Sequence, residues 1–491
     1  MIDKFSKNYS LSRFLNIKYF ILILLLIFFL GFLLGAVGIR YGYIKNSYYF
    51  LKNIPKIIDN YSNIITRKIT DYETVNIDMK FEEFQIITSN RDRNILEGHA
   101  VYTKNDWAKG KINFSSEKKY MNAKFRLKGT MSDNWIKPDG KWSYRVKLRK
   151  ENRYDGMKEF SLFRPNVGSG VLEWLFQKIA KEEGLLTLNT KFVKLNLNGK
   201  HLGYYYLQEH YSKALIENND RREGPLVGYG KERLVKLWYS DPSQILNSNG
   251  FNIADLKLTG DYKKLNPEQK KLSSYALGLL EKLRNRDVQP SKILDVDSTA
   301  KLLALRAVIA SSDLDWKDIK FYYNPLSSKL EPIVREAHAE YDLFDWWYRG
   351  TRQLKTINVD HTTFEDIIFS DKLIYEKYIE YLRKYFSTDI IQKTINNNRD
   401  DFDQIVASLA LSNDVDEWFD NLRVRKEKIK SAFSHPDPIS VSLIDNKFLK
   451  IRNYQFFPII IKKIIFNNKA YIYENNNLVI QGKINDEKYH D

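Results

Sequence analysis

The chain has 491 residues, a formal net charge of +17 and no cysteine. The lack of cysteine excludes disulfides, thiolate zinc sites and cysteine nucleophiles. A hydrophobic fraction of 43%, with 14% aromatic residues, excludes a largely disordered chain, and the length predicts two lobes with appendages. The positive charge favours an anionic partner such as phospholipid, nucleotide, an envelope polymer or an acidic protein. No basic block marks a nucleic-acid footprint, so we expect no nucleic-acid partner.

An apolar segment without charged residues covers residues 19–39, after a short basic tail at residues 1–18. Its length suffices to cross a bilayer, and the small-residue sequence near its end is a poor signal-peptide cleavage site. We therefore expect an uncleaved single-pass anchor in a bacterial inner membrane, with the bilayer as one partner. A short basic tail before a long domain favours an extracytoplasmic body, although Lys and Arg are nearly balanced across the span.

Residues 40–75 carry spaced aromatic and apolar side chains, which indicates a juxtamembrane tether at the membrane surface. Residues 76–210 then alternate apolar and polar side chains, and this period of two predicts a strand-rich nucleotide lobe. The expected strands cover residues 79–84, 100–103, 107–112, 120–128 and 142–148.

One helix is expected in this lobe, over residues 172–183, with Gly184 as its C-cap. A hairpin follows over residues 192–209. Its turn is predicted at Asn198-Gly199, because that dipeptide is the strongest short hairpin signal.

Helical spacing dominates residues 211–435, which predicts a second, helical lobe. A proline-containing break precedes the C-terminal extension at residues 436–491, where short strands are expected. No internal repeat is visible.

Four carboxylates flank two predicted strands of the second lobe. Asp313, Asp315 and Asp318 precede the first strand, and Glu336 follows the second. Carboxylates at neighbouring strand ends can supply a catalytic base and oxygen ligands for Mg²⁺. A strand lobe, a helical lobe and carboxylates at their junction form the order of a protein kinase, although the kinase glycine loop and His-Arg-Asp signature are missing. Acidic residues beside strands are also common on solvated surfaces.

Four segments in order carry a family resemblance: RLKGTMS at 126–132, KWSYRVKL at 141–148, GMKEFSL at 156–162, and LNLNGKHLGYYYLQE at 195–209. Together they resemble the CotH family of atypical, protein-kinase-like proteins. The resemblance implies a two-lobed α+β fold like that of protein kinases. It also implies ATP and Mg²⁺ as cofactors, and serine residues of partner proteins as phosphate acceptors.

The resemblance further implies that the first two segments lie over the nucleotide phosphates. The matching positions are Arg126, Lys128, Ser132, Lys141 and Lys147. Cations on adjacent strands can neutralise phosphate charge, which fits this role independently. Lys and Arg are so frequent in this chain that ordinary exposed strand faces are the alternative interpretation.

Two glutamates of the strand-rich lobe have open roles. Glu173, on the expected helix, could orient a phosphate-binding lysine, or it could be a solvated acid favoured by the helix dipole. Glu209, at the end of the hairpin, could lie near the nucleotide or simply be the last exposed position of its strand.

The acidic site departs from the family pattern of aspartate, asparagine and aspartate. The first position corresponds to Asp313 or Asp315, expected to be catalytic. Asp318 replaces the asparagine and Glu336 replaces the second aspartate, and both are the expected metal ligands. Glutamate is one methylene longer than aspartate, and Mg²⁺ demands near-ideal octahedral geometry, so the site is either active in altered form or inactive.

Three functions follow from these observations. The first is a membrane-anchored kinase that transfers the γ-phosphate of ATP to a protein or an envelope component. The second is a pseudokinase that binds a nucleotide or a partner without transfer. The third is an assembly or binding protein for envelope or surface polymer, built on a kinase-like scaffold.

Overall fold

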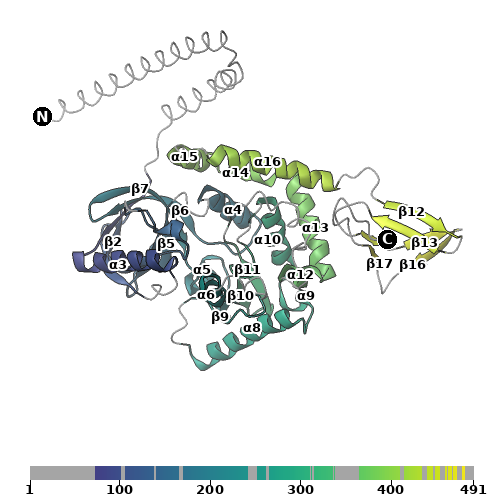
Figure 1. Ribbon diagram of the computed structural model, residues 1–491, viewed down its shortest axis with the longest axis horizontal. Coiled ribbons are helices and arrows are strands. Elements are labelled where there is room, and N and C mark those ends of the chain that lie inside the picture. Colours follow the sequence, from purple (N-terminus) through teal and green to yellow (C-terminus); the bar gives the residue numbers. More distant parts are fainter. Residues whose placement is uncertain are drawn as a thin grey trace, which may run out of the picture. The chain divides into compact units, whose positions relative to one another are not determined.

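A computed structural model of the protein forms a mixed α+β fold, which confirms the expected class (Figure 1). Residues 19–39 lie outside the described part, and no described helix is long and apolar enough to cross a membrane. The described residues are 72–100, 106–137, 140–164, 170–240, 251–260, 265–309, 311, 314–335, 337, 364–409, 414–433, 439–445, 448–453, 459–461, 463–466, 468–472 and 478–480.

Seven strands of the first half close into a barrel in the order β1-β2-β3-β4-β5-β7-β6, in which β1 runs parallel to β6 and the other neighbours are antiparallel. Alternate apolar residues of these strands fill the barrel interior, because successive side chains of a strand point to opposite faces. The strands are β1 (Thr74–Asp78), β2 (Ala108–Phe114), β3 (Met121–Leu127), β4 (Tyr144–Leu148), β5 (Glu159–Phe163), β6 (Thr190–Leu197) and β7 (Lys200–Glu209).

The hairpin between β6 and β7 turns where the sequence predicts it. Asn198 and Gly199 both have positive φ angles, 49° and 77°. A two-residue hairpin turn of this kind requires such angles, and asparagine and glycine adopt them at the lowest cost.

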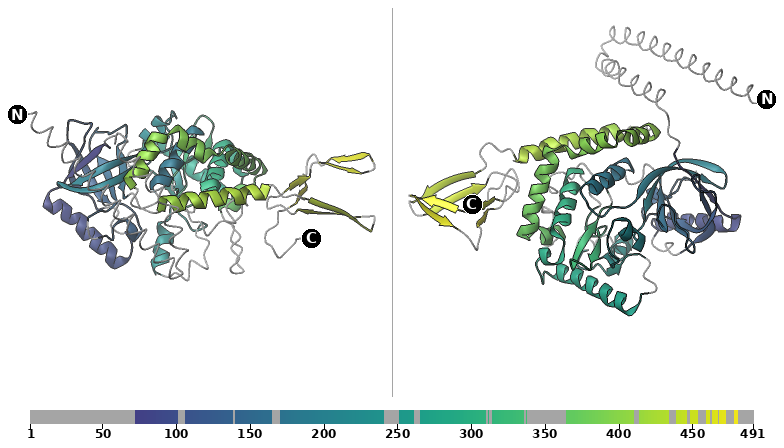
Figure 2. Two further views of the ribbon diagram at one scale, coloured as in Figure 1. Left: turned by 90° about the horizontal axis from the view of Figure 1, so that it is seen from above. Right: turned by 180° about the vertical axis from the view of Figure 1, so that it is seen from behind.

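The strand predicted at residues 79–84 is wrong, and so is the expectation of one helix in this half. Helix α3 (Phe81–Glu97) begins there and packs on β2 and β3 (Figure 2). Its buried face includes Asn90 and Asn94, so apolar residues do not recur at helical spacing in this segment. The sequence therefore does not indicate an amphipathic helix here. Gly98, with a φ of 74°, ends the helix.

The second half is built around a four-stranded sheet in the order β11-β10-β8-β9. A large apolar core joins this sheet to α4, α8, α10 and α13. The strands are β8 (Leu226–Tyr229), β9 (Leu256–Leu258), β10 (Lys320–Asn324) and β11 (Lys329–Ile333). The helices are α4 (Gly170–Glu182), α5 (Lys213–Asn218), α6 (Glu232–Ser240), α8 (Pro267–Asn285), α9 (Pro290–Ile293), α10 (Val296–Ile309), α12 (Phe364–Phe369), α13 (Lys372–Ser387), α14 (Ile390–Asn397), α15 (Arg399–Leu409) and α16 (Asp414–Phe433).

Short antiparallel strand pairs follow α16, as the sequence predicts for the C-terminal extension. They pair β12 with β13, β14 with β17, and β15 with β16. The strands are β12 (Ile439–Ile444), β13 (Phe448–Asn453), β14 (Ile459–Ile461), β15 (Lys463–Phe466), β16 (Lys469–Ile472) and β17 (Leu478–Ile480).

Candidate functional site

A row of polar side chains crosses the outer face of the barrel. Arg126 of β3 pairs with Arg145 of β4, Arg145 with Ser161 of β5, and Ser161 with Gln208 of β7. The residues next to them along each strand point into the barrel core, so strand alternation places this row outside. The row therefore brings two guanidinium groups together on adjacent strands.

Arg145 is the centre of this row. Its side chain is buried, with a residue exposure of 3%, and Nη1 lies 3.7 Å from Glu159 Oε1. Nε and Nη1 have no hydrogen-bond partner among the residues that the structure describes. Burial lowers the pKa of Arg145 to about 9; Glu159 opposes this shift, while Arg126 and Arg335 add to it. A buried cation with unsatisfied donors is costly, so this position favours an additional anion.

A second guanidinium and an uncharged imidazole interact with Arg145. Burial lowers the pKa of Arg126, whose guanidinium lies 5.1 Å from the Trp107 ring centre. Burial lowers the pKa of His210 well below its usual value, and the charges of Arg145, Arg335, Lys128 and Arg126 lower it further.

Glu159 is the carboxylate at the centre of this cluster. Its oxygens lie 3.5 Å from Lys147 Nζ and 3.6 Å from Nε2 of the uncharged His210, besides the contact with Arg145. One carboxylate beside Arg126, Arg145 and Lys147 leaves the cluster positive.

Helix α4 connects the row to the second sheet through Glu173, which is 4% exposed and hence not a solvated acid. Gln208 Nε2 and Gln177 Nε2 donate to Glu173 Oε1 at 3.0 and 2.9 Å, and Ala337 N donates to Oε2 at 2.6 Å. Gln177 also donates to Val334 O at 2.9 Å. Glu173 and Gln177 thus hold both ends of segment 334–337, the chain around Glu336.

Asp315 and Asp318 lie in the turn before β10, among lysines. Lys231 Nζ donates to Asp318 Oδ1 at 2.6 Å, and Lys317 contacts Asp315 through both its backbone N and its Nζ. Burial alone would raise the pKa of Asp318, but Lys231, Lys317 and Lys320 together lower it. Burial raises the pKa of Asp315, with Asp318 adding to the shift and Lys317 opposing it.

The remaining predicted site residues lie in the loop between β3 and β4, which follows Lys128, or outside the described chain. Ser132 begins a short 3-10 helix, η1 (Ser132–Asn134), and Lys141 is exposed between that turn and β4. Asp313 and Glu336 are outside the described residues. In the part that the structure describes, no group of three acidic or histidine side chains could hold a metal ion.

Glu209 faces away from the cationic row, since it neighbours Gln208 along β7. It is buried, and it accepts hydrogen bonds from Asn189 N at 3.1 Å and from Asn218 Nδ2 at 3.5 Å. Burial raises its pKa to about 7 despite these hydrogen bonds. This carboxyl group therefore titrates near neutrality without contacting the arginines.

We expect Glu209→Gln to stabilise the protein at pH 8 and to change it little at pH 5. A carboxyl whose pKa rises on folding is protonated in the fold between its ordinary value of 4.5 and about 7, so the free energy of unfolding falls across that window. Removing the charge should restore about 1 to 3 kcal/mol at pH 8. Thermal unfolding of both proteins at both pH values measures this, and equal shifts at the two would contradict it.

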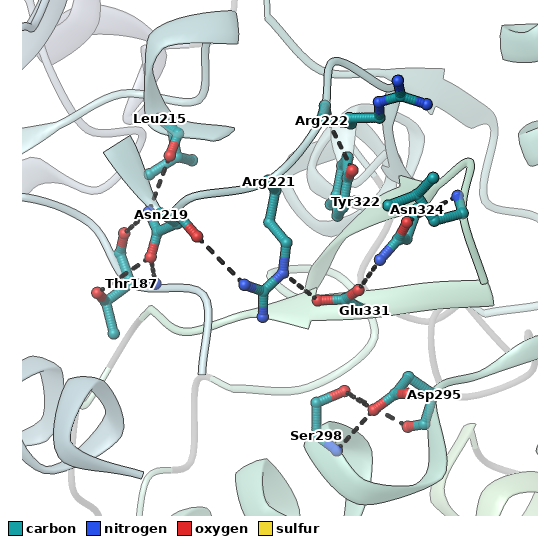
Figure 3. A network of polar contacts seen from close by, with 11 residues as sticks. Thr187, Leu215, Asn219, Arg221, Arg222, Asp295, Ser298, Tyr322, Asn324 and Glu331 are labelled. Atoms are coloured by element: carbon teal, nitrogen blue, oxygen red, sulfur yellow. Dashed lines mark hydrogen bonds and ion pairs between the residues drawn. The ribbon is translucent and has the colours of Figure 1, made fainter. Parts of the chain in front are cut away.

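A separate polar network steadies strand β11 (Figure 3). Arg221 Nε donates to Glu331 Oε2 at 3.1 Å, and Asn324 Nδ2 donates to Glu331 Oε1 at 2.5 Å. Arg221 Nη1 also reaches Asn219 O at 3.2 Å, and Asn219 exchanges hydrogen bonds with the backbone of Thr187. The network links Thr187, which precedes β6, to β11, the strand that precedes residues 334–337.

Sequence reasoning missed Arg145, Glu159 and His210. The alternation of β4 places Arg145 on the same face as Lys147, which was a usable signal. Its pairing with Arg126 depends on strand register, and its burial depends on packing between distant segments, so neither was visible.

Residues 125–408, more than half of the chain, match the family described as CotH kinase protein. The chain belongs to this family. Membership confirms the resemblance seen in the sequence and supports a kinase-like scaffold. The CotH match begins within β3, so α3 lies before it.

Among curated proteins, none matches this CotH-family chain. Among solved structures, a chain from the toxin–antitoxin complex of HipA, HipB and its operator DNA from Shewanella oneidensis MR-1 is similar at 11% sequence identity, with a TM-score of 0.27. The similarity covers 55% of this chain and 57% of that chain. The match thus spans a little over half of the solved chain.

Proposed function

We propose that this protein binds Mg-ATP and transfers the γ-phosphate to a serine of a partner protein or to an envelope component. The CotH kinase family implies ATP and a divalent metal in general terms. Anchoring in a bacterial inner membrane through residues 19–39 belongs to the same proposal. The default extracytoplasmic side would place the body where ATP is scarce and would favour the assembly or binding function instead.

The observation that carries the proposal is the buried guanidinium of Arg145, with two donor nitrogens that lack hydrogen-bond partners within the described part of the chain. Phosphate oxygens are the acceptors that arginine binds most effectively, because the guanidinium fork matches their geometry. A nucleotide phosphate would satisfy these donors and offset the charge of the cluster. The residues that would hold it are Arg126, Lys128, Arg145 and Lys147.

The acidic residues complete the proposed site. Asp313 or Asp315 would accept the proton of the serine hydroxyl, and the raised pKa of Asp315 suits a proton acceptor. Asp318 and Glu336 would hold Mg²⁺ through carboxylate oxygens. Magnesium, when bound, would offset the charge of the phosphates.

One contact favours a second function, nucleotide binding without transfer. Lys231 Nζ lies 2.6 Å from Asp318 Oδ1, so an ammonium group already neutralises this candidate ligand. A metal ion would have to compete with that ion pair. A pseudokinase is therefore the alternative to an active enzyme.

Calorimetric titration of the full-length protein with ATP, with and without Mg²⁺, tests the proposal. We expect binding that depends on Mg²⁺. Transfer of radiolabelled γ-phosphate then separates the kinase from the pseudokinase, and no binding heat in any condition leaves only the scaffold function.

A further inference from the structure

Helix α3, which precedes the family match, is fastened to the loop between β3 and β4. Arg91 Nε donates to Trp135 O at 3.0 Å, and Arg91 Nη2 donates to Ile136 O at 2.8 Å. The Arg91 guanidinium also lies 5.4 Å from the Trp142 ring centre. One side chain thus contacts the loop on both sides of its residues 138–139.

The loop is otherwise shaped by its own hydrogen bonds. Trp135 N and Ile136 N both donate to Ser132 O, at 3.0 and 2.8 Å, which forms the turn that begins at Ser132. Gly129 has a φ of 93°, and a Cβ there would lie 2.2 Å from the Asn134 side chain. The loop therefore folds back tightly on itself beside Lys128. Arg91 binds the carbonyls of residues 135 and 136, whose N–H groups close this turn.

A second contact of α3 reinforces the first. Phe84 stacks nearly parallel to Trp142, with ring centres 6.1 Å apart and an interplanar angle of 9°. Trp142 Nε1 in turn donates to Lys137 O at 2.5 Å. The two sides of the loop are therefore joined to each other and to the helix.

Hydrogen bonds from a cation to backbone carbonyls are stronger than neutral ones, and those of Arg91 are partly shielded, since its side chain is 17% exposed. Two such bonds to consecutive carbonyls restrict the orientation of the loop. A loop held in one orientation loses less conformational entropy when it binds a ligand.

We infer that Arg91 is a positioning residue, through which α3 holds the loop around Ser132 in the orientation that receives the nucleotide phosphates. The identity of the ligand, Mg-ATP, rests on the proposed function. The contact between Arg91 and the loop does not depend on it. Arg91 does not contact the ligand in this role, since Nε and Nη2 donate to the carbonyls of residues 135 and 136 and Nη1 donates to Asp92 Oδ1 at 3.2 Å.

The test compares Arg91→Met with Arg93→Met in the full-length protein. Arg93 lies on the same helix, is 50% exposed, and forms an exposed ion pair with Asp106 at 3.5 Å. Both variants lose one positive charge of α3, but only Arg91→Met frees the loop. Arg91→Lys is the milder variant, because lysine keeps the charge but cannot donate from two fixed nitrogens.

We expect faster amide hydrogen exchange in peptides covering residues 131–137 for Arg91→Met, an intermediate rate for Arg91→Lys, and the parent rate for Arg93→Met. In calorimetry, the Kd for Mg-ATP should rise about tenfold in Arg91→Met, while adenosine, which lacks phosphate, should bind all three variants as it binds the parent. A purely structural role of Arg91 would weaken both ligands alike.

Unchanged exchange in Arg91→Met would overturn the fastening. Faster exchange with an unchanged Kd for Mg-ATP would overturn the positioning role. If the parent binds no ATP, the proposed function fails, while the exchange comparison still decides whether α3 fastens the loop.

Discussion

Arg145→Met should abolish most of the affinity for Mg-ATP while leaving the protein equally stable or more stable. Removing a buried donor from a charged contact costs about 2 to 5 kcal/mol of binding, which corresponds to a Kd at least about 30-fold higher. In the free protein, two nitrogens of this side chain are buried and have no hydrogen-bond partner in the ranges that the structure describes. Replacing Arg145 alone leaves Glu159 beside Lys147 and His210, and the loss of the 3.7 Å contact with Glu159 is offset by removing a buried cation with unsatisfied donors.

The opposite signs make this variant informative. A residue that serves the fold would lower the thermal midpoint when removed, whereas a residue kept for a ligand would not. Arg149→Met is the matched control, because Arg149 follows β4 directly and is exposed. Equal binding by Arg145→Met and the parent, or a large fall in its thermal midpoint, would return Arg145 to a structural role.

The local elements were predictable where one periodicity dominates. Strands β3 and β4, helix α4 and the Asn198-Gly199 hairpin follow from alternation, helical spacing and turn chemistry. Helix α3 was missed because asparagines occupy its buried face, which conceals the helical period. Short-range pattern therefore predicted the elements whose buried faces are apolar.

The candidate site was predictable only in part. Most cations in and near β3 and β4 could be named from the sequence. Which of them matters most for binding could not be predicted, because Arg145 is buried and Lys141 is exposed, and the sequence does not show this difference. Glu209 follows Gln208 directly, yet only Gln208 reaches Glu173. Strand register and the packing of α4 against the barrel decide such differences, and both depend on segments far apart in the chain.

Two substitutions of Asp318 should have similar effects on stability but very different effects on phosphate transfer. Asp318→Asn and Asp318→Ala both remove the carboxylate that pairs with Lys231. Because the Lys231 side chain is 36% exposed, we expect each to cost only about 1 to 2 kcal/mol of stability. That loss should disappear in acid, since a carboxyl with a lowered pKa stabilises the fold above its ordinary value of 3.8 and loses this contribution as the pH falls below it.

The two variants should differ sharply in phosphate transfer. Asparagine keeps a side-chain oxygen for Mg²⁺, so Asp318→Asn should retain transfer within about tenfold and need more Mg²⁺, because a neutral ligand binds the ion less tightly. Alanine offers no oxygen, so Asp318→Ala should lose at least about 100-fold. Magnesium titrations of γ-phosphate transfer, run beside thermal unfolding of each variant, compare the two at matched stability. Equal losses in both would mean that the charge holding Lys231 matters rather than the oxygen, and full activity in both would make Asp318 a structural partner of Lys231.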